Sequence, residues 1–116
     1  MALADLRDAL QAAGFDATIT GGFVTFPYVI PVGGHLGTTV TIGLSAPDFP
    51  INPPGGVHVR PRIQHPGDNA HHASPLGMDW IYWSRPYPDW SQSARSVSDY
   101  LAHLRKLFSQ FAVQAA

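Results

Sequence analysis

The sequence predicts an α+β domain in which an N-terminal helix, a four-stranded antiparallel meander, a long loop and a C-terminal helix follow one another. Apolar residues recur at helical spacing near both ends of the chain, and short alternating segments lie between them. A chain of 116 residues is long enough for one core, because autonomous domains cluster around ~100–150 residues. We therefore expect residues 1–116 to form a single domain.

Two amphipathic helices are expected. In residues 2–13 the helically spaced apolar positions are Leu3, Leu6, Ala9, Leu10 and Ala13. Gly14 follows them, where a left-handed helix terminus favours glycine. The second helix begins after Ser96, because a hydroxyl followed three residues later by Asp99 matches a capping box. Its apolar face comprises Val97, Tyr100, Leu101, Leu104, Leu107, Phe108 and Phe111.

Four strands are expected between these helices. Residues 15–20 and 23–26 alternate in polarity on either side of Gly21-Gly22, a pair that suits a tight hairpin turn. Alternation resumes in residues 38–44 and again in residues 57–63. The two helices are expected to pack on one face of the resulting sheet.

Prolines and a long irregular segment mark the remaining connections. Pro50, Pro53 and Pro54 exclude a helix or a central strand, so residues 48–54 should cross over as an extended loop. Residues 64–89 are rich in His, Pro, Gly and aromatic side chains and show no sustained period. Connections of more than ~12–15 residues inside a compact domain are usually functional. We therefore expect the functional site in this segment.

Charge and hydropathy narrow the range of partners. Seven Lys and Arg residues against eight Asp and Glu residues give a net charge of -1, and the cations are scattered, so the basic footprint of nucleic-acid binding is missing. No run approaches the ~18–20 apolar residues that span a bilayer. Asp5 and Arg7 interrupt the region where a signal peptide would be apolar. We expect a cytoplasmic protein with no nucleic-acid or membrane partner.

Three motifs follow one another along the chain: Phe49-Pro50-x-x-Pro53-Pro54 before the fourth strand, His65-Pro66 after it, and Trp90 before the last helix. Their order resembles that of the ubiquitin-conjugating enzyme (UBC) fold. The resemblance is to short bacterial members of this superfamily and covers nearly the whole chain. It implies a UBC-like fold, no cofactor, and two partners: a ubiquitin-like protein and an activating-enzyme-like protein.

The chain departs from this family where the family's chemistry resides. A thioester requires a thiolate, and the chain contains no cysteine. The asparagine that follows His-Pro in the family is replaced by Gly67, while Asn69 lies two residues later. The resemblance gives His65, Pro66 and Asn69 a structural role in the loop. We expect a cysteine-less pseudoenzyme that acts as an accessory or binding subunit in a bacterial ubiquitin-like modification pathway.

Two other function classes remain open. His71 or His72 could act as general base for Ser74, which would make an oxyester carrier, or both could bind zinc together with His65 or Asp79. Adjacent histidines rarely converge on one ion, and a hydroxyl is a poor nucleophile unless activated. We therefore expect no metal site and assign no catalytic residue. The remaining class is an interaction module unconnected with ubiquitin-like proteins.

Aromatic side chains are concentrated shortly before the last helix. Trp80, Tyr82, Trp83 and Tyr87 are candidate partner-binding residues, because aromatic anchors dominate the energetics of protein interfaces. Trp83 or Tyr82 is the favoured interface position, and the alternative for these aromatic residues is packing over the open side of the sheet. Trp90 is expected in the core.

Overall fold

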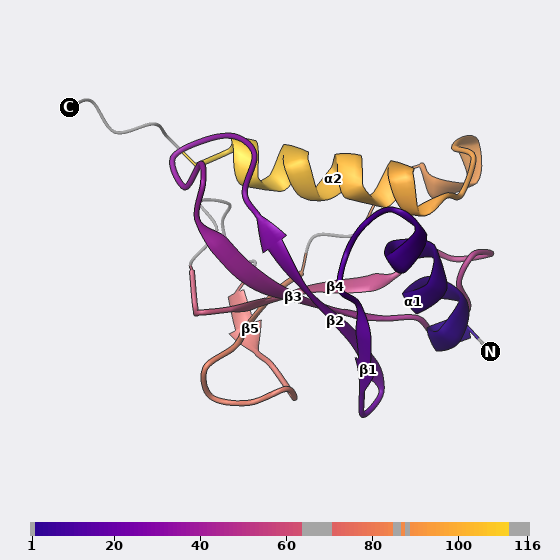
Figure 1. The fold of residues 1–116 in the computed structure, drawn as a ribbon, viewed down its shortest axis with the longest axis horizontal. Helices are drawn as coiled ribbons and strands as arrows, with labels where there is room; N and C mark the ends of the chain where they lie inside the picture. Colours follow the sequence, from indigo (N-terminus) through magenta and orange to yellow (C-terminus); the bar gives the residue numbers. More distant parts are fainter. Residues whose placement is uncertain (1, 64–70, 85–86, 88, 112–116) are drawn as a thin grey trace.

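The computed structural model describes residues 2–63, 71–84, 87 and 89–111 (Figure 1). Over these residues the chain is α+β, with a helix at each end and strands between them, as predicted. The elements are α1 (Ala2–Ala12), β1 (Thr18–Thr20), β2 (Phe23–Val29), β3 (Thr39–Ser45), β4 (Gly55–Arg60), β5 (His71–Ala73), β6 (Ile81–Trp83), the 3-10 helix η1 (Trp90–Gln92) and α2 (Val97–Ser109).

The described strands form one antiparallel sheet with the order β1-β2-β3-β4-β6-β5. The predicted count of four strands is wrong: the sheet has six, because two segments of the expected long loop are strands. β6 pairs with β4 through Tyr82 opposite His58 and Ile81 opposite Val59, and β5 adds at the edge. Each of these two strands has only three residues, which is too short to produce a recognisable alternation in the sequence.

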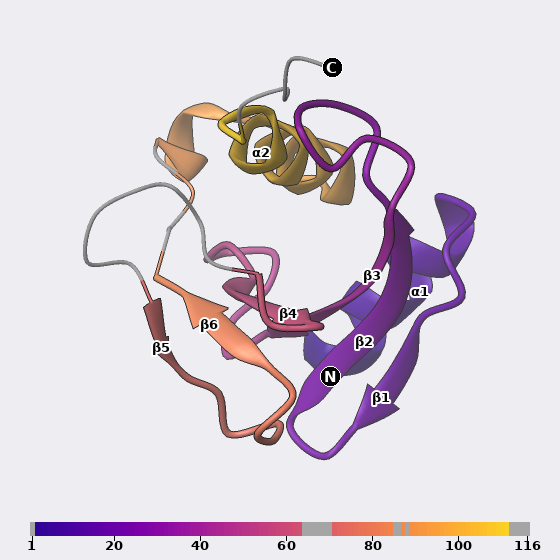
Figure 2. The same ribbon diagram turned by 90° about the vertical axis from the view of Figure 1, so that its left-hand side faces the viewer.

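The sheet is curved, and α2 lies along its concave side (Figure 2). Phe26, Ile42 and Val59 occupy neighbouring positions on β2, β3 and β4, and each is at most 1% exposed. Leu104 and Phe108 of α2 are fully buried in the same cluster. Burying a Leu or Phe side chain contributes roughly 1.5–3 kcal/mol, so this cluster is the main hydrophobic contribution to the fold.

α1 packs against the β1 and β2 end of the sheet. Leu6 and Leu10, one turn apart on α1, are fully buried. Gly14 adopts a φ of 97°, which a residue with a Cβ rarely adopts, and the chain turns away from the helix there. The side-chain amide of Gln11 then donates a hydrogen bond to the carbonyl of Ala17 (3.0 Å), which fixes the chain as it enters β1.

α2 begins at the predicted capping box. The backbone N–H of Asp99 donates to Ser96 Oγ (3.3 Å), and the Asp99 carboxylate accepts from the Ser96 N–H (3.1 Å). Tyr100 and Leu107 are buried, as the apolar pattern predicted. Leu101 is only half-buried, because it borders a groove between α2 and the start of the chain.

Two of the motifs that carry the family resemblance are in contact. The indole Nε1 of Trp90 donates a hydrogen bond to the carbonyl of Pro50 (2.9 Å), and the ring lies 6.4 Å from that of Phe49. Trp90 is 5% exposed, so its predicted core position is confirmed. The proline-rich crossover is therefore attached to the segment that leads into α2.

No helix among the described residues combines the length and the apolar character that a transmembrane helix needs.

Candidate functional site

Part of the segment that was expected to carry function, residues 74–80, folds over the face of the sheet opposite α2. β5 and β6 are joined by residues 74–80, here called the 74–80 loop. Leu76 and Trp80 of this loop lie over Gly43 of β3: a Cβ added at Gly43 would be 2.6 Å from Leu76 Cδ1 and 3.4 Å from the Trp80 ring. The missing side chain at Gly43 thus makes room for the loop.

His58 and Ser74 form a direct hydrogen bond beneath this loop. The distance between His58 Nδ1 and Ser74 Oγ is 2.8 Å. Ser74 Oγ also accepts a hydrogen bond from the backbone N–H of Leu76 (3.1 Å), so its own hydrogen is available for Nδ1. When Ser74 donates to Nδ1, the neutral imidazole of His58 carries its proton on Nε2.

The surroundings of His58 keep the imidazole neutral. His58 is 6% exposed and lies between two rings, with centroids 4.9 Å from Phe23 and 4.6 Å from Tyr82. Burial lowers the pKa of His58 to about 4, because the charged form loses its hydration. At neutral pH this imidazole is a weak base, because its pKa lies well below the range in which general bases are effective.

The residue bonded to Ser74 is therefore one that the sequence analysis did not single out. His72, the candidate base, is exposed and lies on the other side of Tyr82, with ring centroids 5.7 Å apart. His71 occupies the register position opposite Trp83. The sequence did contain a signal for His58: it alternates with Val57 and Val59, so it must point to the opposite face from those two core residues.

The candidate interface aromatics have different positions. Trp83 is fully buried and donates from Nε1 to the carbonyl of Ile63 (2.8 Å), so the expectation that it faces a partner is corrected. Trp80 is 7% exposed, with the Arg60 guanidinium 5.0 Å from its ring. Tyr82 and Tyr87 are half-buried. A concave sheet face needs large side chains to fill it, which explains why β6 contributes a tryptophan to the core.

Tyr87 packs beside the last helix. Its ring centroid lies 5.1 Å from that of Trp90, 6.4 Å from that of Tyr100 and 5.3 Å from that of His103. The hydroxyl of Tyr100 is buried without a hydrogen-bond partner among the described residues, and burial raises its pKa. This cluster stabilises the start of α2 against the crossover.

The three residues expected to have a structural role in the loop, His65, Pro66 and Asn69, lie outside the described residues. Among the residues that are described, no group of three or more His, Cys, Asp or Glu side chains is placed to hold a metal ion.

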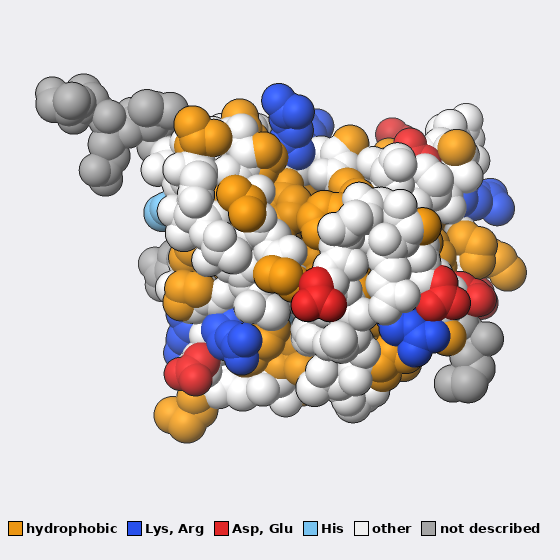
Figure 3. Space-filling view, in the orientation of Figure 1, with side chains coloured by type: hydrophobic (Ala, Val, Ile, Leu, Met, Phe, Trp, Pro, Cys, Tyr) orange, Lys and Arg blue, Asp and Glu red, His pale blue; other side chains and the backbone are white. Residues whose placement is uncertain are grey.

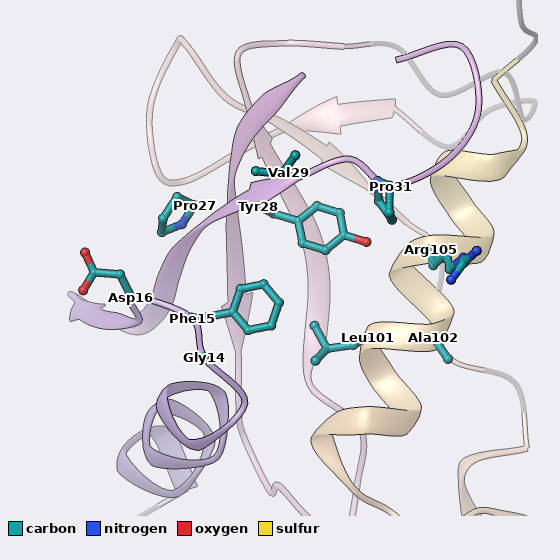
Figure 4. A pocket seen from close by; sticks show the side chains of 10 residues that line it. All are labelled: Gly14, Phe15, Asp16, Pro27, Tyr28, Val29, Pro31, Leu101, Ala102 and Arg105. Carbon is teal, nitrogen blue, oxygen red and sulfur yellow. The ribbon is translucent and has the colours of Figure 1, made fainter. Parts of the chain in front are cut away.

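A concave surface with an apolar lining lies apart from the His58–Ser74 pair, and its lining shares no residue with the 74–80 loop. A groove of about 700 Å3 runs between the end of α1, β2 and α2. Figure 3 shows hydrophobic side chains reaching the surface between the two helices. The residues that line it are Gly14, Phe15, Asp16, Pro27, Tyr28, Val29, Pro31, Leu101, Ala102 and Arg105 (Figure 4). Sequence analysis missed this groove, because its walls come from three segments that are far apart in the chain.

The geometry thus offers two features: a His–Ser pair under a loop and an open apolar groove. No protein-family model, curated protein or solved structure matches this chain.

Proposed function

We propose that this protein is a noncovalent binding subunit of a ubiquitin-like modification pathway, a cysteine-less relative of the ubiquitin-conjugating enzymes. Its partners are a ubiquitin-like protein and an activating-enzyme-like protein. It presents surfaces to them and does not carry the modifier through a thioester.

The order of the motifs supports the family part of this proposal. A helix, an antiparallel meander, a proline-rich crossover, a tryptophan and a packing helix follow one another as in the UBC pattern. The hydrogen bond from Trp90 Nε1 to the Pro50 carbonyl joins two of these motifs across 40 residues. Two strands beside β4 are an addition to the expected pattern.

The main support for a binding role comes from the nucleophilic groups of the chain. The chain contains no cysteine. Ser74 is hydrogen-bonded to a histidine, His58. The pKa of His58, about 4, makes this histidine a weak base. Both hydrogen bonds of Ser74 tie the 74–80 loop to the sheet. This geometry supports a structural use of the pair, which leaves noncovalent contacts as the means of action.

The test first establishes whether genes for a ubiquitin-like protein and an activating enzyme lie beside this gene, and then mixes the two encoded proteins with this chain and ATP. We expect a complex in calorimetry or size-exclusion chromatography and no mass added to this chain under denaturing conditions. Absence of binding to both proteins would contradict the proposal. If neither gene lies in the neighbourhood, the pathway assignment is contradicted and an unrelated interaction module is favoured.

One observation favours a second candidate function, an oxyester carrier. Ser74 Oγ lies 2.8 Å from a histidine nitrogen and borders a cavity of about 290 Å3 with Arg62, Gly77 and Met78. In this reaction Ser74 Oγ would attack an activated carbonyl, its proton would pass to His58 Nδ1, and the activating group would leave. A hydroxylamine-labile adduct that is absent from Ser74→Ala would establish this function in place of the binding role.

A further inference from the structure

The edge of β2 is open where it passes the large groove. β1 pairs with β2 only from Phe23 to Thr25, although β2 continues to Val29. Continued beyond Phe26, the same register would place Pro27 opposite Asp16, and proline has no N–H for the ladder. The chain before β1 turns towards α1 instead, where Gln11 holds the Ala17 carbonyl. Residues 27–31 therefore have a strand on one side only.

The backbone groups on this open side can be assigned by alternation. The N–H of Ile30 donates to the Thr38 carbonyl (2.9 Å), and the Ile30 carbonyl accepts from the Gly37 N–H (2.8 Å), so both groups of Ile30 point towards β3. Successive residues of a strand direct their backbone groups to opposite sides. Both backbone groups of Val29 consequently point away from β3 and towards the groove. The carbonyl of Pro27 points the same way.

Apolar rings form the floor next to this edge. Phe15 and Tyr28 stack with ring centroids 6.2 Å apart, and the half-buried Leu101 borders them from α2 (Figure 4). An extended segment beside β2 would direct alternate side chains onto this floor. The groove volume of about 700 Å3 is within the range of binding sites for small ligands and short peptides.

One end of the groove carries a positive charge. Arg105 lies at the Pro31 end, where the Tyr28 hydroxyl points towards it (Figure 4), and it has no ion-pair partner among the described residues. Just beyond, the β2–β3 connection crosses to the end of α2, and the Gly34 N–H donates to the Phe111 carbonyl (3.0 Å). A chain that runs along the groove towards Arg105 approaches this junction, which favours a chain end over a continuing chain at this position.

We propose that this groove binds the free C-terminal segment of a partner protein as an extended strand parallel to β2. Val29 supplies a donor and an acceptor, Pro27 supplies a second acceptor, and the terminal carboxylate pairs with Arg105. The inference rests on the proposed binding function and names its surface. Asp16 at the opposite end repels a carboxylate and so favours this orientation over the reverse one.

The probe is fluorescein-labelled Gly-Thr-Leu-Thr-Leu with a free carboxylate, titrated with the full chain and followed by polarisation. The C-terminal amide should bind about fivefold to tenfold more weakly, because it loses one charge-assisted contact. Methylation of the backbone nitrogen of the central leucine should weaken binding by a similar factor. Arg105→Gln should bind the acid as weakly as the amide and should bind the amide normally.

Lys106→Gln is the matched control, since Lys106 is also exposed on α2 but borders a different cavity with Tyr87 and His103. It should bind the acid like the unmodified chain. Equal binding of acid and amide, an unchanged affinity in Arg105→Gln, or no saturable binding would overturn the groove assignment.

Titration with the intact ubiquitin-like protein separates this inference from the proposed function. If that protein binds equally to the unmodified chain and to Arg105→Gln, the groove assignment is overturned and the proposed function stands. If the peptide acid binds as described but the ubiquitin-like protein does not, the groove assignment stands and the proposed partner is wrong.

Discussion

The imidazole of His58 and the hydroxyl of Ser74 are 2.8 Å apart although 16 residues separate them in the chain. This bond connects β4, near the middle of the sheet, to the loop that covers its convex face. Because Ser74 Oγ also accepts from the Leu76 N–H (3.1 Å), one hydroxyl fixes both the start and the path of the 74–80 loop. His58 therefore holds the 74–80 loop in place, and the burial of its ring keeps the imidazole neutral.

The first prediction concerns the dependence of stability on pH. Unfolded His58 takes up a proton near its ordinary pKa of 6.5, whereas folded His58 stays neutral until about pH 4. The unfolded state binds more protons in this window, so the free energy of unfolding should fall as the pH falls from about 6.5 to about 4. We expect a loss of between about 1 and 3 kcal/mol from this group, measured by urea unfolding at several pH values.

His58→Phe is the control for that measurement, because it keeps a neutral ring between Phe23 and Tyr82. The variant should lose most of the pH dependence in this window, whatever its stability at neutral pH. An unchanged slope in His58→Phe would show that other groups are responsible for it.

The second prediction concerns the fit of the 74–80 loop over Gly43. Gly43→Ala should destabilise the protein by about 1 kcal/mol, at the low end for overpacking, because the new Cβ would lie 2.6 Å from Leu76 Cδ1, the end of a flexible side chain. In a Leu76→Ala background the same change should cost clearly less, since the clashing methyl is gone. Gly22→Ala is the matched control: no atom lies within 4 Å of its added Cβ, and it should be close to neutral in thermal unfolding.

The third prediction separates core tryptophans from surface aromatics. Trp83→Ala and Trp90→Ala should each cost about 3–5 kcal/mol, because both rings are buried and both indole nitrogens are hydrogen-bonded. Tyr82→Ala should cost less, because Tyr82 is only half-buried. Denaturant unfolding of the three variants provides the measurement. A Trp83→Ala protein as stable as the unmodified chain would show that Trp83 is not part of the core.

Local patterns in the sequence were sufficient to predict the helices and the antiparallel meander. The capping box at Ser96 and Asp99 and the glycine at position 14 depend on neighbours within a few residues, so their geometry follows from local chemistry. β1 to β4 were predicted for a similar reason, because alternation and turn residues are both visible within short windows. β5 and β6 were not, since three residues carry too little pattern.

The candidate site was predictable only in part. Ser74 was singled out, but its partner was expected among the adjacent histidines 71 and 72. The actual partner His58 becomes its neighbour only when β6 pairs with β4 and the 74–80 loop folds back. Trp83 was expected at an interface because a sequence of large rings does not say which side of a strand faces the core.

The sequence by itself determined the α+β class, the two amphipathic helices, the antiparallel meander and the absence of thiol chemistry, because propensity, capping, periodicity and residue chemistry act over short distances along the chain. The tertiary structure decided the pairing of His58 with Ser74, the burial of Trp83 and the groove beside Val29 and Arg105. Each of these depends on segments that are distant in sequence and meet only through strand order and helix packing. Their energies come from long-range burial and hydrogen bonding, which no local pattern encodes.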